Sequence, residues 1–436
     1  MKRTRPVLYI FVVLLCGLAQ SLPLWDGDQT AVPGVDTKCI RIQASHPLLS
    51  THMWGGSKPA LVPLAYKILG CDPRRILLAQ TLFSIMAWGS LAIAAALAIR
   101  SLPVALLALL LLLGIGTSGP ISSWNGMMLT ESFSLSLLAS FAAASLWLVR
   151  RPGLAPSIAL VLPGAGLALA RDTNAYALLL LGMLLLPLAL RRAAKPRRRL
   201  LYLALAASFV AIWFGSLRSA DVGKRWLVPF YNVVCERVLT DPHAAAHFQL
   251  AGMPWTDSVR GLAGKGPFGD EEELGEGAEI AAFCDWARDH GRRTYARFLL
   301  AHPGYSLLDP PLRFWQRTSS RIDKAPAGFR SGLVDKAEFI LNRPISLLPF
   351  LVVFLAVVVE AVWLAIRRRR THLWVPILML ALAPPQILLV WHGDACEVGR
   401  HSIGALVQVA VGLPLLLLFV ADYLPWSIRR TARRWS

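Results

Sequence analysis

A short segment with six polar or ionisable side chains in eleven positions, WHGDACEVGRH (391–401), lies between two apolar runs. Its candidate substrate-binding residues are His392, Asp394, Glu397, Arg400 and His401. A carboxylate can accept a proton from a hydroxyl group, and an arginine can bind a phosphate. If the segment is partly helical, Asp394, Glu397 and His401 share one face at spacings of three and four residues. These three residues also suit a divalent metal ion, which the sequence leaves open as a cofactor.

Three further clusters of ionisable residues lie beside apolar runs. Asp26 and Asp28 follow the first run, Glu131 begins the fourth, and Arg171 and Asp172 lie in the short connection between the fifth and sixth. Arginine is uncommon in short extracytoplasmic loops, because positive charge is retained in the cytoplasm. Arg171 therefore indicates binding of an anionic group. For a single carboxylate such as Glu131, an interfacial position without chemistry is an equally good interpretation.

The elements that must position these residues are membrane-spanning helices. The chain has 436 residues, 55% of them hydrophobic, and a mean hydropathy of +0.52. A helix of about 20 apolar residues spans the bilayer core. We therefore predict an all-α polytopic membrane protein of about ten transmembrane helices, with a long first outer loop and an inserted, mainly helical ectodomain. The predicted spans are 7–24, 76–99, 102–119, 131–149, 154–170, 175–190, 200–217, 347–366, 373–390 and 402–421.

These spans divide the chain into three predicted parts. Residues 1–217 form an N-terminal membrane module of about seven spans, whose first outer loop, 25–75, carries the catalytic residues. Residues 218–346 form an extracytoplasmic insert. Residues 347–436 form a C-terminal membrane module of about three spans.

Basic residues give the orientation of the spans. Runs of Lys and Arg occur at both termini and at 191–199 and 367–370, all on one predicted side of the membrane. Since such residues are retained inside, we predict a multi-pass protein of the cytoplasmic membrane with both termini in the cytoplasm. The net charge of +19 is then a topology signal and an attraction to anionic lipid. No nucleic-acid partner is predicted, because the basic runs are juxtamembrane and lack a nucleic-acid-binding motif.

All the ionisable clusters lie at the predicted outer ends of spans. A closed helix bundle would bring them together in one pocket at the outer membrane surface. Such a pocket suits a lipid phosphate whose head group faces outward. Arginine can neutralise the phosphate as it leaves, and a carboxylate can accept the proton of an attacking hydroxyl. This chemistry is glycosyl transfer from a polyprenyl-phosphate sugar to an acceptor hydroxyl.

These features also resemble a known family, the GT-C membrane glycosyltransferases, in particular the protein O-mannosyltransferase and aminoarabinose-transferase type. The resemblance is carried by Asp26–Asp28, KPALVPLAYKILG (58–70), LTESFSLSLL (129–138), ARDTNAY (170–176) and DACEVGRH (394–401). It implies an inverting hexosyl- or pentosyltransferase with a polyprenyl-phosphate sugar as donor substrate. The family's catalytic base, an acidic residue of the first outer loop, corresponds to Asp26 or Asp28. The family's phosphate-binding basic residues correspond to Arg171 and Arg400.

The expected partners are membrane lipid, the lipid-linked sugar donor and an acceptor glycan, lipid or protein. Many relatives carry a soluble domain at the C-terminal end, whereas the predicted ectodomain here lies between the seventh and eighth spans, which leaves the acceptor open. A transporter or flippase of a lipid-linked or anionic substrate is the alternative function. It requires polar residues in mid-span, where these runs are mainly Leu, Ala and Val. A non-enzymatic scaffold would have no need for ionisable residues at the ends of several spans.

Overall fold

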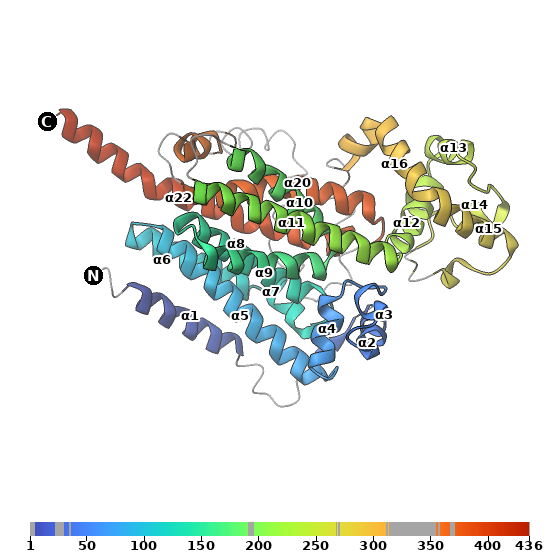
Figure 1. Cartoon of the computed structure of the whole chain (residues 1–436), viewed down its shortest axis with the longest axis horizontal. Helices are drawn as coiled ribbons and strands as arrows, with labels where there is room; N and C mark the ends of the chain where they lie inside the picture. The colour runs from blue at the N-terminus through green and yellow to red at the C-terminus, as the bar shows by residue number, and fades with distance from the viewer. Residues whose placement is uncertain are drawn as a thin grey trace. The chain divides into compact units, whose positions relative to one another are not determined.

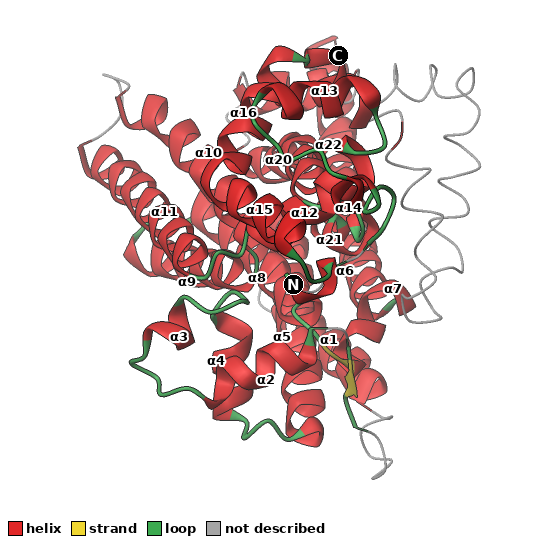
Figure 2. Cartoon of the chain, turned by 90° about the vertical axis from the view of Figure 1, so that its right-hand side faces the viewer, coloured by secondary structure: helices red, strands yellow, loops and turns green. Residues whose placement is uncertain are grey.

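The chain is α-helical in the computed structural model (Figure 1). One pair of two-residue strands occurs among the residues that the structure describes (Figure 2). The described residues are 5–21, 30–34, 36–190, 196–266, 268, 271–310, 313, 355, 358–366 and 371–435. The prediction of an all-α protein is confirmed.

Several described helices are long and apolar enough to cross a membrane. Six meet this condition: α5 (Pro73–Ala98), α8 (Glu131–Arg150), α10 (Asp172–Leu190), α11 (Pro196–Val222), η8 with α20 (Thr371–Leu373 and Trp374–Gly393), and Ile403–Tyr423 of α22 (Ile403–Trp435). A seventh is formed if α6 (Leu102–Thr117) is counted with the segment Gly119–Gly126, from which it is bent by 49°. That segment comprises α7 (Gly119–Ser122) and η2 (Ser123–Gly126).

The structure confirms some, but not all, of the about ten predicted spans. The apolar helices α1 (Arg5–Ser21) and α9 (Leu154–Ala170) coincide with two predicted spans but are shorter than the other six. Half of the predicted span at 347–366 lies outside the described residues. The structure therefore supports a multi-pass membrane protein with at least six long apolar helices among its described residues.

The chain forms two compact units. The first contains residues 1–219, 326–383 and 404–436, and the second contains residues 220–325 and 384–403. The first boundary lies close to the predicted start of the insert. The second unit also includes the segment 384–403, which the predicted division placed in the C-terminal membrane module, 347–436.

In the first unit, the predicted first outer loop, 25–75, contains three short helices. These are α2 (Thr37–Ser45), α3 (Thr51–Trp54) and α4 (Leu61–Ile68), which gather near one end of α5 in Figure 1. Ahead of them, β1 (Val32–Pro33) pairs in parallel with β2 (Met127–Met128), the segment that precedes α8. Ile40, Val62 and Tyr66 are fully buried around Met128. Burial of these apolar side chains fixes the loop against the start of α8.

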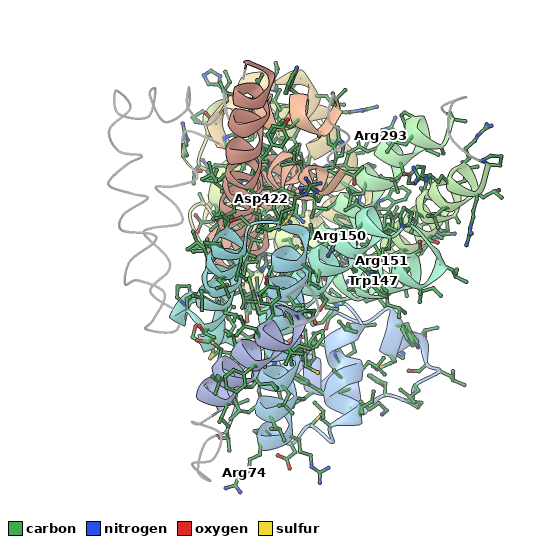
Figure 3. All side chains as sticks on the ribbon, turned by 90° about the vertical axis from the view of Figure 1, so that its left-hand side faces the viewer. Arg74, Trp147, Arg150, Arg151, Arg293 and Asp422 are labelled. Atoms are coloured by element: carbon green, nitrogen blue, oxygen red, sulfur yellow. The ribbon has the colours of Figure 1, made fainter. Side chains whose placement is uncertain are left out.

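The start of α5 is fixed by residues next to it in the sequence. Asp72 precedes α5 and accepts hydrogen bonds from the backbone N–H groups of Arg74 and Arg75 at 2.8 and 3.3 Å, and Pro73 occupies the first helical position. Figure 3 labels Arg74 at this start.

The start of α6 is capped from a distant part of the chain. Asp422 of α22, labelled in Figure 3, accepts hydrogen bonds from the backbone N–H groups of Arg100 and Ser101 at 3.1 and 2.8 Å. The side chain of Ser101 makes no capping hydrogen bond itself. A carboxylate is favourable there because the helix N-terminus carries a partial positive charge.

The second unit is built from short helices around an aromatic core. Its elements up to residue 310 are α12 (Leu227–Val233), η3 (Val234–Val238), α13 (Pro242–Leu250), α14 (Asp257–Arg260), η4 (Glu272–Leu274), α15 (Ala278–Trp286), η5 (Ala287–Gly291), α16 (Arg292–Ala301) and η6 (Gly304–Leu308), and α21 (Val398–His401) follows later in the chain. Tyr231, Phe248 and Phe283 are fully buried in the core. η3, η5 and η6 are π-helical turns, a form that is rare and is often found at functional sites.

Candidate functional site

The segment 391–401 forms a tight turn between the end of α20 and the short helix α21. The carboxylate of Asp394 shapes this turn. Its Oδ1 accepts hydrogen bonds from the backbone N–H groups of Cys396 and Glu397 at 2.9 and 3.4 Å. The Asp394 side chain is 8% exposed. Asp394 therefore lies beneath the turn and not at its surface.

The predicted cluster is present in this segment. Oδ2 of Asp394 lies 2.9 Å from Nδ1 of His401, and Oε2 of Glu397 lies 3.8 Å from Nε2 of His401. Arg400 joins the cluster through Nη2, which is 2.9 Å from Glu397 Oε2 and 3.1 Å from His401 Nε2. The side chains come together because Asp394 lies in the turn before α21, and not because the three residues share one helix face.

The hydrogen bonds favour one form of His401. Nδ1 faces a carboxylate oxygen and therefore carries the proton. Nε2 faces an arginine N–H, which can only donate, so Nε2 presents its lone pair. In this arrangement Nε2 of His401 is an oriented acceptor nitrogen. An acidic residue that fixes the tautomer of a histidine is common to general bases and to metal ligands.

Asp394 is ionised throughout the physiological pH range. Burial opposes its ionisation, but the imidazole of His401 and the N–H groups of Cys396 and Glu397 outweigh burial and lower its pKa to about 2. The cluster therefore keeps a permanent negative charge under the turn.

A second arginine, Arg237, was not identified from the sequence. Its guanidinium lies 4.1 Å from the ring centroid of Trp391 and donates hydrogen bonds to the backbone carbonyls of Trp391 and of Asp394, the latter at 3.2 Å. Arg237 is 6% exposed and belongs to the π-helical turn η3. It holds the end of α20 and the turn that carries Asp394. One feature of the sequence would have pointed to Arg237: it stands beside Glu236 inside the apolar run VVCERVL.

His392 is held by other parts of the second unit. Its Nε2 lies 2.8 Å from the carbonyl oxygen of Ser306, and its Nδ1 lies 3.3 Å from the hydroxyl of Tyr295. Nε2 therefore donates to the carbonyl, and Nδ1 accepts from the tyrosine. Both ring nitrogens have protein partners, and the predicted role of His392 in substrate binding stays a prediction.

In the first unit, Glu131 and Arg171 form a buried ion pair. Nη2 of Arg171 donates to Oε1 of Glu131, and the two side chains are 12% and 1% exposed. Oε2 of Glu131 accepts from the hydroxyl of Thr130 at 3.4 Å. Glu131 is the first residue of α8, and Arg171 precedes α10. The chain turns therefore place the pair at the ends of two long apolar helices.

Two further polar residues of the first unit, Asp172 and Tyr66, have defined partners. Oδ1 of Asp172, in the first turn of α10, lies 3.4 Å from the hydroxyl of Ser216 in α11. Tyr66 lies near Glu131, and its hydroxyl accepts a hydrogen bond from Gln80 at 3.3 Å. Burial raises the pKa of Tyr66, the bond from Gln80 opposes this, and the charge of Glu131 adds to the increase. Tyr66 is a site neighbour that the sequence pattern KPALVPLAYKILG contained but did not single out.

The predicted residues thus form two groups. Glu131, Arg171 and Asp172 belong to the first unit, and the cluster in 391–401 belongs to the second. Asp26 and Asp28 lie outside the described residues. That all of them meet in one pocket stays a prediction.

The sequence matches no protein-family model and has no significant match among curated proteins. The resemblance to GT-C glycosyltransferases therefore rests on the short sequence motifs alone.

Proposed function

We propose that the chain is an integral-membrane glycosyltransferase that moves a sugar from a polyprenyl-phosphate donor to an acceptor hydroxyl. The observation that carries this proposal is the ion pair between Glu131 and Arg171, which is buried at the ends of long apolar helices. A departing phosphate requires a fixed cation where water is excluded, because charge stabilisation is strongest there. Arg171 meets this requirement, and Glu131 orients it.

The fold of the first outer loop supports the same proposal. β1 pairs with β2, and Glu131 follows Met128 by three residues. Asp28 precedes Val32 of β1 by four residues, which limits the distance between their Cα atoms to about 14 Å. The proposal places a carboxylate of this loop in the site that contains Arg171.

In the proposed reaction, the acceptor hydroxyl attacks the anomeric carbon of the sugar. The carboxylate of Asp26 or Asp28 accepts the hydroxyl proton as the new bond forms. The bond between the anomeric carbon and the phosphate oxygen breaks, and its electron pair stays on that oxygen. Arg171 neutralises the resulting charge. Attack from the side opposite the leaving group inverts the anomeric configuration.

The reaction is proposed to occur at the outer face of the cytoplasmic membrane, with both termini in the cytoplasm. The donor is then taken from the membrane itself, and the acceptor is a glycan, a lipid or a protein.

The proposal is tested by sugar transfer in membranes supplied with a panel of radiolabelled polyprenyl-phosphate sugars. The wild type is compared with Asp26→Asn, Asp28→Asn and Arg171→Gln, and Arg74→Gln, an exposed arginine of the same unit, is the matched control. We expect label to reach an acceptor in the wild type and in Arg74→Gln. One aspartate variant and Arg171→Gln should lose at least about 100-fold in rate.

The proposal fails if no donor of the panel supports transfer above that of membranes without the protein. If transfer occurs equally in all variants, the chain is a transferase with a different site.

Transport of a lipid-linked or anionic substrate is the second candidate, and one observation favours it. Gln80, Thr81 and Ser84 of α5 are 0%, 4% and 1% exposed, and Ser136 of α8 is 1% exposed. Polar side chains inside spans are typical of substrate paths, although small polar residues also stabilise helix packing. Movement of a fluorescent polyprenyl phosphate across proteoliposomes, lost in Gln80→Leu and independent of an acceptor, would favour transport over transfer.

A further inference from the structure

The cluster Asp394–Glu397–Arg400–His401 contains two carboxylates and one guanidinium. Asp394 and Glu397 are the carboxylates, and Arg400 is the cation that bonds to Glu397. Nε2 of His401 faces an N–H of Arg400. The side chains of Asp394 and Arg400 are only 8% and 14% exposed, so water screens this imbalance poorly. The cluster therefore favours an additional cation.

The geometry also fits a cation. One ligand atom from each of Asp394, Glu397 and His401 can be chosen so that all three lie within 4.8 Å of one another. Oxygen and imidazole nitrogen together suit divalent ions of the Mn²⁺ type better than Mg²⁺ or Ca²⁺, which prefer oxygen alone.

A positive group already lies at this position. Nη2 of Arg400 is within hydrogen-bond distance of both Glu397 Oε2 and His401 Nε2, at 2.9 and 3.1 Å. Those two acceptor atoms are 3.8 Å apart, and a metal ion about 2.1 Å from each could bridge them. The guanidinium and a metal ion would therefore compete for the same two lone pairs.

We propose that Glu397 and His401, with Asp394 bonded to the other ring nitrogen of the histidine, form a divalent-cation site at which a Mn²⁺-type ion exchanges with the guanidinium of Arg400. Glu397 and Nε2 of His401 bind the ion, and Asp394 holds His401 in the required tautomer through Nδ1. When the ion binds, Arg400 leaves Glu397 and becomes available to another anion. This inference does not depend on glycosyl transfer, because binding of the ion requires only the cluster.

The test is Mn²⁺ binding to the purified full-length protein in lipid nanodiscs, measured as loss of the free Mn²⁺ signal in electron paramagnetic resonance. We expect one site, and at least about tenfold weaker binding in Glu397→Gln and in His401→Gln. Arg400→Gln should bind Mn²⁺ several-fold more tightly, because the competing cation is removed. Glu272→Gln and His243→Gln alter exposed residues of the same unit and should bind as the wild type does.

A second measurement covers variants that fold poorly. Bound Mn²⁺ in the wild type should show nitrogen modulation of the electron spin echo from an imidazole ligand, and this modulation should be absent in His401→Gln. The proposal is overturned if wild type and Glu397→Gln bind equally, which would indicate surface binding only. It is also overturned if bound Mn²⁺ lacks an imidazole nitrogen, or if Arg400→Gln weakens binding.

Discussion

Glu131 and Arg171 stabilise the first unit only as a pair. Each would cost several kcal/mol if left charged and alone in a buried position, because neither water nor an opposite charge would compensate it. Glu131 also has the hydroxyl of Thr130 near its second oxygen. The pair is therefore sensitive to loss of either member, whatever its function.

Loss of one member should destabilise the protein strongly. We expect Arg171→Met to lower the free energy of unfolding by about 3 kcal/mol, because Glu131 is left without its cation. The double variant Glu131→Leu/Arg171→Met should recover most of this loss, since neither charge is then buried. Thermal unfolding in detergent, followed by tryptophan fluorescence, measures both effects. Equal midpoints for Arg171→Met and the wild type would contradict the buried pair.

Asp394 should make the stability of the second unit depend on acid pH. Its pKa in the folded protein is about 2, below its ordinary value, so it contributes stability at pH values above that ordinary value. This contribution, about 2 kcal/mol, should be lost as the pH falls from about 4 to about 2. Unfolding of wild type and Asp394→Asn is compared between pH 6 and pH 2. The variant should lack this part of the pH dependence, and parallel curves would contradict the assignment.

At the residue scale, the sequence identified groups that lie close together along the chain. Asp394, Glu397 and His401 were found because they lie within eight residues of one another in the sequence. Arg237 was not found, because its partners follow it by 154 and 157 residues and no local pattern links them. Tyr66 was missed for the same reason, since only the fold of the first outer loop places it near Glu131.

At the element scale, helix contacts in the first unit depend on glycine. A Cβ atom added to Gly116 of α6 would lie 2.5 Å from Cγ of Trp88 in α5, whereas one added to Gly114 would meet no atom within 4 Å. Trp88 is 3% exposed and has little room to move. Gly116 therefore gives a test of this packing, and Gly114 gives a control on the same helix.

Gly116→Ala should destabilise the protein by about 1–3 kcal/mol through overpacking. Gly114→Ala should be neutral or stabilising by up to about 1 kcal/mol, because alanine favours a helix. The difference between the two unfolding midpoints is the test. A Gly116→Ala variant as stable as Gly114→Ala would mean that α5 and α6 do not pack as described.

The cap of α6 by Asp422 gives a further prediction for the elements. Asp422→Ala removes the acceptor for two backbone N–H groups at a helix start and should cost about 1 kcal/mol. Hydrogen exchange should be faster at Arg100 and Ser101 and in the first turn of α6. Asp422→Asn keeps one acceptor oxygen and should lose less. Unchanged exchange at these amides would contradict the cap.

The elements themselves were predicted better than their irregularities. Nine of the ten predicted apolar runs correspond to described helices, because run length and hydropathy determine such helices directly. The bend after α6 and the three π-helical turns were not predicted. They depend on packing between segments far apart in sequence, which hydropathy does not report.

At the scale of the whole molecule, the distribution of basic residues predicts the topology. A fluorescent protein fused after Arg151, which with Arg150 ends α8 in Figure 3, should be active in the cytoplasm. Alkaline phosphatase fused after Gly56, between α3 and α4, should be active outside. The opposite pattern would reverse the predicted orientation and place the Glu131–Arg171 pair at the cytoplasmic surface.

The hydrogen bonds from Arg237 to the carbonyls of Trp391 and Asp394 have a consequence for biosynthesis. Its carbonyl partners at Trp391 and Asp394 are synthesised 154 and 157 residues later, a delay of about 8–30 s at usual elongation rates. During this interval a nascent chain carries a cation whose native acceptors do not yet exist. Chains truncated before Trp391 never obtain them, so we expect membrane quality-control proteases to remove such chains far faster than the full-length protein.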